Sequence, residues 1–289
     1  MSDLQILHVT LRNLDGQLPI QAVRLRPLDG VFYTALGGKA SPLARSIHSI
    51  GAAGRPNPAP YSIGPLFADG YLKGLRIATL QDYTQSKFNL AQVTAEAWDK
   101  LKGKVIQVGS ANMEVIEAAV ESQSTYNQVW AESEPHHGLE LRFDMPTRFP
   151  LYGRDGLLPI PQAIWQCYLL RWNAFSGMAK EIPLEFLTWV QHLVHGVNVT
   201  LETGLAPIER EETASGVMGN VTYQAFREKK PPKGKDYVMP ESQLPRYLRA
   251  WQALAALAEY CGTGMNADIG MGRTRVVSRF GPYRAPQDS

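Results

Sequence analysis

The order of strand-like and helix-like segments predicts an α+β protein of two tandem ferredoxin-like (RRM-like) domains with a C-terminal glycine-rich loop. Three observations support this fold class. Each half of the chain mixes strand and helix patterns in a β-α-β-β order, a polar stretch with Pro135 divides the halves, and four glycines in two G-x-G pairs follow the last helix. We therefore expect an N-terminal domain over residues 1–135 and a C-terminal domain over residues 136–289.

In the first half, alternating polar and apolar residues predict a strand at 5–11 and a hairpin with arms at 61–67 and 72–80. Helical patterns cover 30–36, 43–50 and 90–101, and a loop rich in Gly, Pro and Ala covers 51–60. Further strands are expected at 104–108 and 113–120. The second half has predicted strands at 139–145, 197–201, 217–226 and 273–280 and predicted helices at 161–175, 183–195 and 245–261.

The composition is that of a soluble globular protein, with 44% hydrophobic and 19% charged residues. No apolar run approaches the ~20 residues of a membrane helix, and the first residues lack the pattern of a signal peptide. Cys167 and Cys261 lie in apolar helical patterns, which favours buried thiols over a disulfide or a metal pair. We expect a cytoplasmic protein with no membrane partner and no cofactor.

Positive charge is concentrated in the last part of the chain. The net charge is only +2, but residues 221–289 carry a balance of +5 and the preceding residues −3. Such an asymmetry suggests an anionic partner on one face. The densest basic run contains Arg227, Lys229, Lys230, Lys233 and Lys235, and a solvated loop is the alternative interpretation.

The glycine-rich stretch, residues 262–272 (GTGMNADIGMG), suggests a loop whose backbone approaches a ligand closely. Gly262, Gly264, Gly270 and Gly272 could place amides against a phosphate chain, with Arg273 and Arg275 just after them. A dinucleotide-binding turn is excluded, because that turn follows a strand and opens a helix, which is the reverse of the order here. A plain turn with Gly262 as a helix stop is the alternative.

Several stretches together resemble the CRISPR repeat-processing endoribonucleases, the sixth Cas family of the RAMP superfamily. They are the glycine loop, residues 143–149 (FDMPTRF), 158–161 (LPIP), 171–175 (RWNAF), 216–223 (GVMGNVTY), 43–48 (LARSIH) and 60–66 (PYSIGPL). The resemblance implies two ferredoxin-like domains and metal-independent cleavage of precursor CRISPR RNA within the repeat. The implied partners are the CRISPR repeat RNA, as precursor and as mature crRNA, and other Cas proteins of an effector complex.

One departure from that family concerns the five residues between the glycine pairs. They usually include Lys or Arg in the family, whereas here they contain Asp268 and no basic residue. We therefore expect phosphate contacts from backbone amides, from Arg273 and Arg275, and from the basic run that holds Lys229, Lys230 and Lys233.

RNA is cut without a metal when its 2′-hydroxyl attacks the neighbouring phosphorus, and histidine suits the two proton transfers because its pKa is ~6.5. His48 ends a helix pattern beside the glycine-rich loop and matches the active-site region of the resembling family. Tyr33 matches a catalytic tyrosine of part of that family, although a core aromatic is an equal alternative. Arg55 could supply the positive charge that stabilises the phosphorane, and Lys39 is the alternative candidate for this role.

Other residues invite competing interpretations. His192 with His195, or His136 with His137, could bind a metal, but no carboxylate or cysteine nearby in the sequence completes a site. Trp165, Trp172, Phe175 and Trp189 could stack on bases, but their helical spacing favours core packing. A non-catalytic guide-RNA-binding subunit is the alternative to a ribonuclease. An enzyme of nucleotides or phosphorylated small molecules is disfavoured by the lack of a Walker loop or metal cluster.

Overall fold

The computed structural model describes residues 2–45, 47, 58–83, 88–151, 154–226 and 241–284. Its first half contains β1 (Leu4–Asn13), α1 (Arg26–Ala35), β2 (Tyr61–Ala68), β3 (Tyr71–Leu80), α3 (Leu90–Asp99), β4 (Val105–Val108), β5 (Ala111–Ser124) and α4 (Tyr126–Glu132). Its second half contains β6 (His136–Thr147), β7 (Phe149–Leu151), β8 (Arg154–Gly156), α5 (Pro161–Phe175), α6 (Phe186–Leu193), β9 (Val194–Pro207), β10 (Thr213–Ala225), α7 (Leu244–Cys261) and β11 (Thr274–Pro282). Short 3₁₀ turns lie at Ile20–Ala22, Ala179–Glu181 and Glu241–Gln243.

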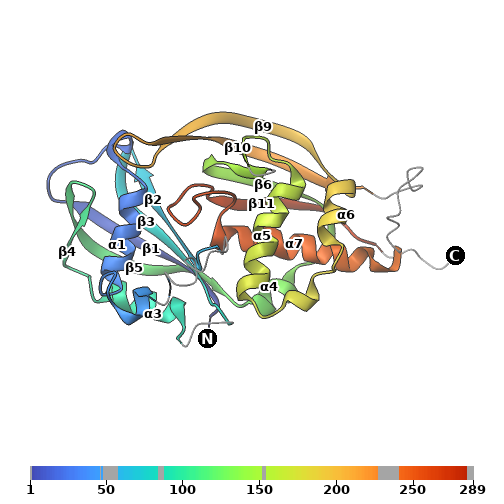
Figure 1. The fold of residues 1–289 in the computed structure, drawn as a ribbon, viewed down its shortest axis with the longest axis horizontal. Coiled ribbons are helices and arrows are strands. Elements are labelled where there is room, and N and C mark those ends of the chain that lie inside the picture. Colours follow the sequence, from blue (N-terminus) through green and yellow to red (C-terminus); the bar gives the residue numbers. More distant parts are fainter. Residues whose placement is uncertain are drawn as a thin grey trace.

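Two antiparallel sheets repeat one topology (Figure 1). The N-terminal sheet has the order β2-β3-β1-β5-β4, and the C-terminal sheet has the order β11-β6-β10-β9. In each sheet the first strand lies between the third strand and the last long strand, which is the arrangement of the ferredoxin-like fold. The predicted fold class is therefore confirmed. The limit between residues 135 and 136 stays a prediction, because segments of the second half also pack into the first.

Local sequence accounts for several element boundaries. Asp69 and Gly70 both have positive φ in the β2–β3 turn, the conformation that a tight hairpin requires. The side chain of Asn89 caps α3 by accepting from the Gln92 amide. Thr125 and Gln128 form a reciprocal capping box on α4, a short helix that the hydrophobic periodicity did not predict.

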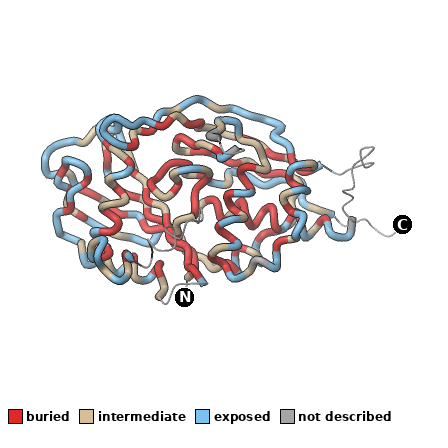
Figure 2. Tube along the Cα trace, viewed as in Figure 1, coloured by how far each residue is buried: buried red, intermediate tan, exposed pale blue. Residues whose placement is uncertain are grey.

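The predicted helix at 183–195 is shorter than expected. It covers only Phe186–Leu193, because β9 begins at Val194 and pairs with β10 up to Ala225. His195 therefore lies in a strand and not on the helix face of His192. The β9–β10 hairpin then passes over the outside of the molecule toward α1, and β9 is exposed along most of its length (Figures 1 and 2).

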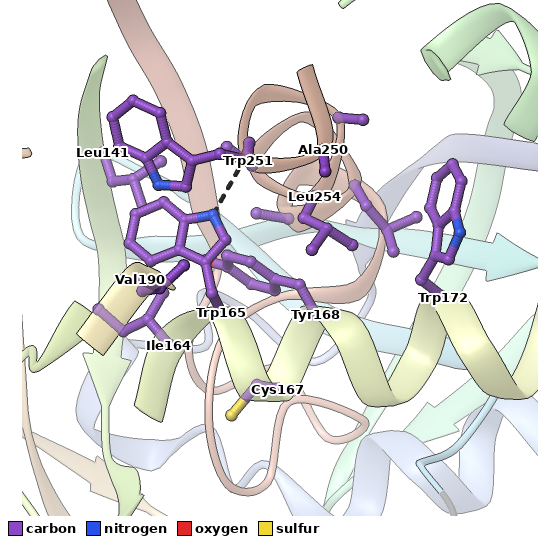
Figure 3. Packing of buried hydrophobic residues seen from close by; sticks show 14 of the residues in the cluster. Leu141, Ile164, Trp165, Cys167, Tyr168, Trp172, Val190, Ala250, Trp251 and Leu254 are labelled. Carbon is purple, nitrogen blue, oxygen red and sulfur yellow. Dashed lines mark hydrogen bonds between the residues drawn. The ribbon is translucent and has the colours of Figure 1, made fainter. Parts of the chain in front are cut away.

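The larger core belongs to the C-terminal half and is rich in aromatic side chains. Trp165, Trp172, Trp189 and Trp251 are fully buried in it, and the Trp165 indole N–H donates to the Trp251 carbonyl at 3.1 Å (Figure 3). Trp165, Trp172, Phe175 and Trp189 are thus core residues and not a surface for base stacking. Leu4, Ile6 and Leu80 of the N-terminal sheet join this core.

The second core lies under the N-terminal sheet and receives residues from the C-terminal half. Ile269 and Met271 of the glycine loop, with Ala206, Ile208 and Ala214 of the β9–β10 hairpin, are buried there. The two halves are consequently joined by shared cores. None of the described helices combines the length and the apolar composition that crossing a bilayer requires.

Candidate active site and nucleic-acid interface

The glycine loop connects α7 to β11 and lies against the N-terminal sheet (Figure 1). The Ile63 amide of β2 donates to the Asp268 carbonyl at 2.9 Å. A Cβ on Gly270 would lie 2.6 Å from the Gly64 Cα, so only glycine permits the two backbones to approach this closely. The loop is therefore a joint between the two halves.

Within the loop, glycine is required by the protein's own backbone. A Cβ on Gly264 would lie 1.9 Å from the Arg148 carbonyl oxygen, and one on Gly272 would lie 1.9 Å from the Thr263 carbonyl oxygen. The amides of Thr263, Met265 and Gly272 donate to carbonyls of Gly272, Arg148 and Pro146 at 2.8, 2.9 and 3.0 Å. These three amides are not available to a phosphate, and RNA contact by Gly262, Gly264, Gly270 and Gly272 stays a prediction.

A cleft of about 520 Å³ lies between the two halves beside this loop. His8 and Arg76 line it from the N-terminal sheet, and Arg273 and Arg275 line it from the C-terminal sheet. Arg76 donates to the Glu259 carbonyl, and Arg275 forms an ion pair with Asp144 at 3.1 Å. The structure thus places two of the predicted RNA-binding residues together and adds Arg76, which the sequence reading did not single out.

Arg273 differs from Arg275, which pairs with Asp144, and from Arg76, which donates to a backbone carbonyl. Within the described residues, no carboxylate oxygen lies within ion-pair distance of its guanidinium. Burial lowers the pKa of Arg273, since desolvation penalises the charged form. Glu121, Asp144 and Glu259 line the same cleft, so its three arginines face three carboxylates, and Asp144 and Glu121 raise the pKa of Arg273 against the effect of burial. Since none of them pairs with Arg273, this partly buried cation can still bind an anion.

A small cavity of about 130 Å³ lies at the predicted catalytic tyrosine. Its lining consists of Asp29 and Tyr33 from α1, followed by Lys39, Ala44 and Arg45. Lys39 is exposed, whereas the Tyr33 side chain is 5% exposed. Of the two candidate phosphorane stabilisers, Lys39 lies beside Tyr33, and Arg55 lies outside the described residues.

The Tyr33 hydroxyl belongs to a short chain of polar groups. It lies 3.2 Å from the Tyr61 hydroxyl, which donates to a carboxylate oxygen of Asp29. The Phe32 and Tyr61 rings stack with centroids 4.3 Å apart, which holds Tyr61 in place. Asp29, Tyr61 and Arg45 were not identified from the sequence. Asp29 lies one turn before Tyr33 on α1, whereas only the packing of β2 on α1 brings Tyr61 to Tyr33.

Burial governs the protonation of this cluster. It raises the pKa of Tyr33 against an opposing contribution from the Tyr61 contact, and the carboxylates of Asp29 and Asp268 add to the rise. Burial followed by the Asp29 carboxylate raises the pKa of Tyr61 far above its usual range, and burial raises the pKa of Asp268. Tyr33 is therefore a neutral phenol at pH 7 and is unsuited to act as a base.

The remaining predicted site residues lie outside the described part of the chain. These are His48, Arg55, Lys229, Lys230 and Lys233. The neighbouring residues Ala44 and Ile47 are buried in the N-terminal core. Among the residues that the structure describes, no three His, Cys, Asp or Glu side chains are grouped as metal ligands would be.

Comparison with known proteins adds a family and a fold. Residues 141–274 match the family model of the CRISPR-associated endoribonuclease Cas6. No curated protein sequence matches the chain.

Solved Cas6 structures share the fold of almost the whole chain. The Cas6 (TTHA0078) product complex has a TM-score of 0.70 at 23% identity, covering 95% of this chain and 99% of that one. The product complex of Cas6 (TTHB231) has a TM-score of 0.73 at 19% identity, with 95% and 100% covered. Thermus thermophilus Cas6 (TTHB231) has a TM-score of 0.67 at 20% identity, with 96% and 99% covered. The family match over residues 141–274 and the shared fold confirm that this chain resembles the CRISPR-associated Cas6 endoribonucleases.

Proposed function

We propose that this protein is a metal-independent endoribonuclease that cleaves precursor CRISPR RNA within the repeat. The products would carry a 2′,3′-cyclic phosphate and a 5′-hydroxyl. The observation that carries this proposal is the match of residues 141–274 to the Cas6 endoribonuclease family. The cavity at Tyr33, with Lys39 and Arg45 in its wall, supports it with suitable chemistry.

In the proposed reaction the 2′-oxygen loses its proton and bonds to phosphorus, while the bond from phosphorus to the 5′-oxygen breaks and that oxygen takes up a proton. His48 is our candidate for the general acid or base. The neutral Tyr33 hydroxyl would donate a hydrogen bond that orients the reacting group. A cation, Lys39 or Arg55, would stabilise the charge that develops on the phosphoryl oxygens.

We assign RNA affinity to two surfaces, one with three arginines beside three carboxylates and one with a run of lysines. The first is the cleft between the halves, where Arg273 is a partly buried cation without an ion-pair partner among the described residues. Arg275 and Arg76 line the same cleft. The second is the predicted basic run with Lys229, Lys230 and Lys233. Phosphate contacts of this kind make binding fall as the salt concentration rises.

The glycine loop would act on RNA mainly by joining the two halves. Its close contacts with β2, through Gly270 and Gly64, hold the cleft arginines at a fixed distance from α1 and Tyr33. A rigid joint of this kind keeps the bound phosphates in register with the reacting one.

The test uses purified protein and the repeat RNA of the CRISPR array in the same genome, with EDTA throughout. We expect one cut within the repeat, a 2′,3′-cyclic phosphate on the upstream product, and no cut when the nucleotide before the scissile phosphate is 2′-deoxy. Cleavage that requires added Mg²⁺ would contradict the mechanism. Tight binding without a cut would instead indicate a guide-RNA-holding subunit that does not cleave.

A further inference from the structure

A second groove, of about 680 Å³, lies on the outside of α1 and adjoins the Tyr33 cavity. Asp29 and Lys39 line both hollows, so the two form a continuous surface. The rest of its wall comes from Arg24 just before α1, from Arg26, Pro27 and Gly30 in its first turns, and from Glu209 and Arg210 in the loop between β9 and β10.

The groove is a built feature and not a chance gap between loops. The Leu25 amide donates to the Pro207 carbonyl at 3.0 Å, and the Arg26 amide donates to the Ile208 carbonyl at 3.1 Å. Ile208 itself is fully buried in the N-terminal core. The hairpin of the C-terminal half is thereby fastened to the helix that carries Tyr33.

The charges in this groove favour an anion. Four cationic side chains, Arg24, Arg26, Lys39 and Arg210, face two carboxylates, Asp29 and Glu209. The Arg26–Glu209 ion pair is half-exposed on both sides, so solvent screens it and a phosphate can replace it at little cost. Asp29 is engaged by the Tyr61 hydroxyl.

We propose that this groove binds the unpaired RNA strand on one side of the scissile phosphate. The inference rests on the proposed function, since it takes the Tyr33 cavity as the place of cleavage. Attack by a 2′-oxygen needs that oxygen, the phosphorus and the leaving oxygen in line, which a regular duplex does not allow. The strand on at least one side of the cut must therefore leave the duplex, and such a flexible strand can follow the cations from Lys39 to Arg210.

The experiment measures the affinity of non-cleavable repeat RNA, 2′-deoxy before the scissile phosphate, for three variants. Arg24→Ala combined with Arg210→Ala removes two cations, Glu209→Gln removes a carboxylate, and Arg12→Ala is the control. Arg12 is an exposed arginine paired with Glu114 that lines neither hollow. Each protein is titrated with the whole repeat and with repeats that end at the scissile phosphate on its 5′ or its 3′ side.

We expect the double variant to bind the whole repeat at least ~10-fold more weakly, with a salt slope reduced by about 0.7 for each lost contact. Glu209→Gln should bind more tightly than the wild type, and Arg12→Ala should bind as the wild type does. With one of the two shortened RNAs, the double variant should bind as tightly as the wild type does. The segment that this RNA lacks is then the one that binds in the groove.

A wild type that binds and cuts the repeat, beside a double variant of unchanged affinity, would overturn this inference and leave the proposed function standing. A penalty that persists with both shortened RNAs would also overturn it, since the contacts would then lie in the remaining stem. If the wild type neither binds nor cuts, the proposed function fails and the inference fails with it.

Discussion

The N-terminal and C-terminal halves have the same strand order but bury different kinds of side chain. Under the N-terminal sheet, the buried cluster includes Tyr33 and Tyr61, whose hydroxyls lie beside the partly buried Asp29 and a small cavity. The C-terminal half has an aromatic core around Trp165 and Trp251 (Figure 3). Residues of its glycine loop and of the β9–β10 hairpin also pack into the core of the N-terminal half. One topology thus supports two kinds of interior, a polar cluster beside a cavity in the first half and an aromatic core in the second.

The largest effect should come from the histidine predicted for the first half. His48→Ala is expected to lower the cleavage rate by about 10²–10⁴-fold, because a general acid or base is lost. RNA affinity should stay within a few-fold. His136→Ala, which changes a partly buried histidine of the C-terminal sheet, should cleave like the wild type. If His48→Ala cleaves at the full rate, His48 is not the general acid or base, and the reaction is not assigned to the first half.

The glycine loop can be tested as a joint by a matched pair of substitutions. Gly272 and Gly109 have φ values of +63° and +62°, so alanine at either position costs the left-handed strain of about 1–2 kcal/mol. A Cβ on Gly109 meets nothing within 4 Å, but one on Gly272 lies 1.9 Å from the Thr263 carbonyl oxygen. Gly272→Ala should therefore lower the free energy of unfolding by a further ~1–3 kcal/mol, measured in urea. If the two variants lose the same free energy of unfolding, the loop accommodates the additional Cβ at residue 272 without cost.

The cleft between the halves should govern salt-dependent binding. Arg273→Ala is expected to weaken binding of repeat RNA about tenfold and to lower the salt slope by ~0.7, because one buried phosphate contact is lost. Arg249→Ala removes an exposed arginine of α7 and should change neither quantity. Equal effects of the two variants would mean that the cleft has no special part in binding.

The smallest effect concerns the tyrosines that both halves bury. Burial raises the pKa of Tyr223, whose hydroxyl donates to the Pro159 carbonyl at 2.8 Å. Its contribution to stability is complete below the unfolded pKa of ~10 and is lost as the pH rises toward the folded value. Tyr223→Phe should lower the free energy of unfolding by about 1 kcal/mol at pH 7, measured in urea. The difference in stability between the wild type and the variant should disappear above pH 10. A difference that is constant from pH 7 to 11 would contradict this.

Local patterns in the sequence were sufficient for most of the fold. The predicted hairpin at 61–80, the helix at 161–175 and the helix at 245–261 match β2, β3, α5 and α7 closely. Their periodicity identifies the apolar face that must be buried, and this does not depend on which other element packs against that face. The helix predicted to reach His195 was too long, because the pairing of β9 with β10 overrides the local helical pattern.

The site was only partly predictable. Tyr33 was identified from a family resemblance, and Arg273 and Arg275 from their place after the glycine loop. Arg76 and Tyr61 carry no local signal, since each stands in an ordinary strand pattern. Their significance arises from what the other half of the chain, or α1, brings against them.

The sequence by itself therefore determined most of the long elements in their order, the ferredoxin-like fold class and a glycine loop after α7, since these follow from periodicity and backbone freedom. It did not indicate α4, β7 or β8. The tertiary structure decided what those glycines touch and which charges meet in the cleft and at Tyr33. Asp268 stands near the other end of the chain from Tyr33, yet its carboxylate raises the pKa of Tyr33. Such proximity depends on how two halves pack, which no short stretch of sequence encodes.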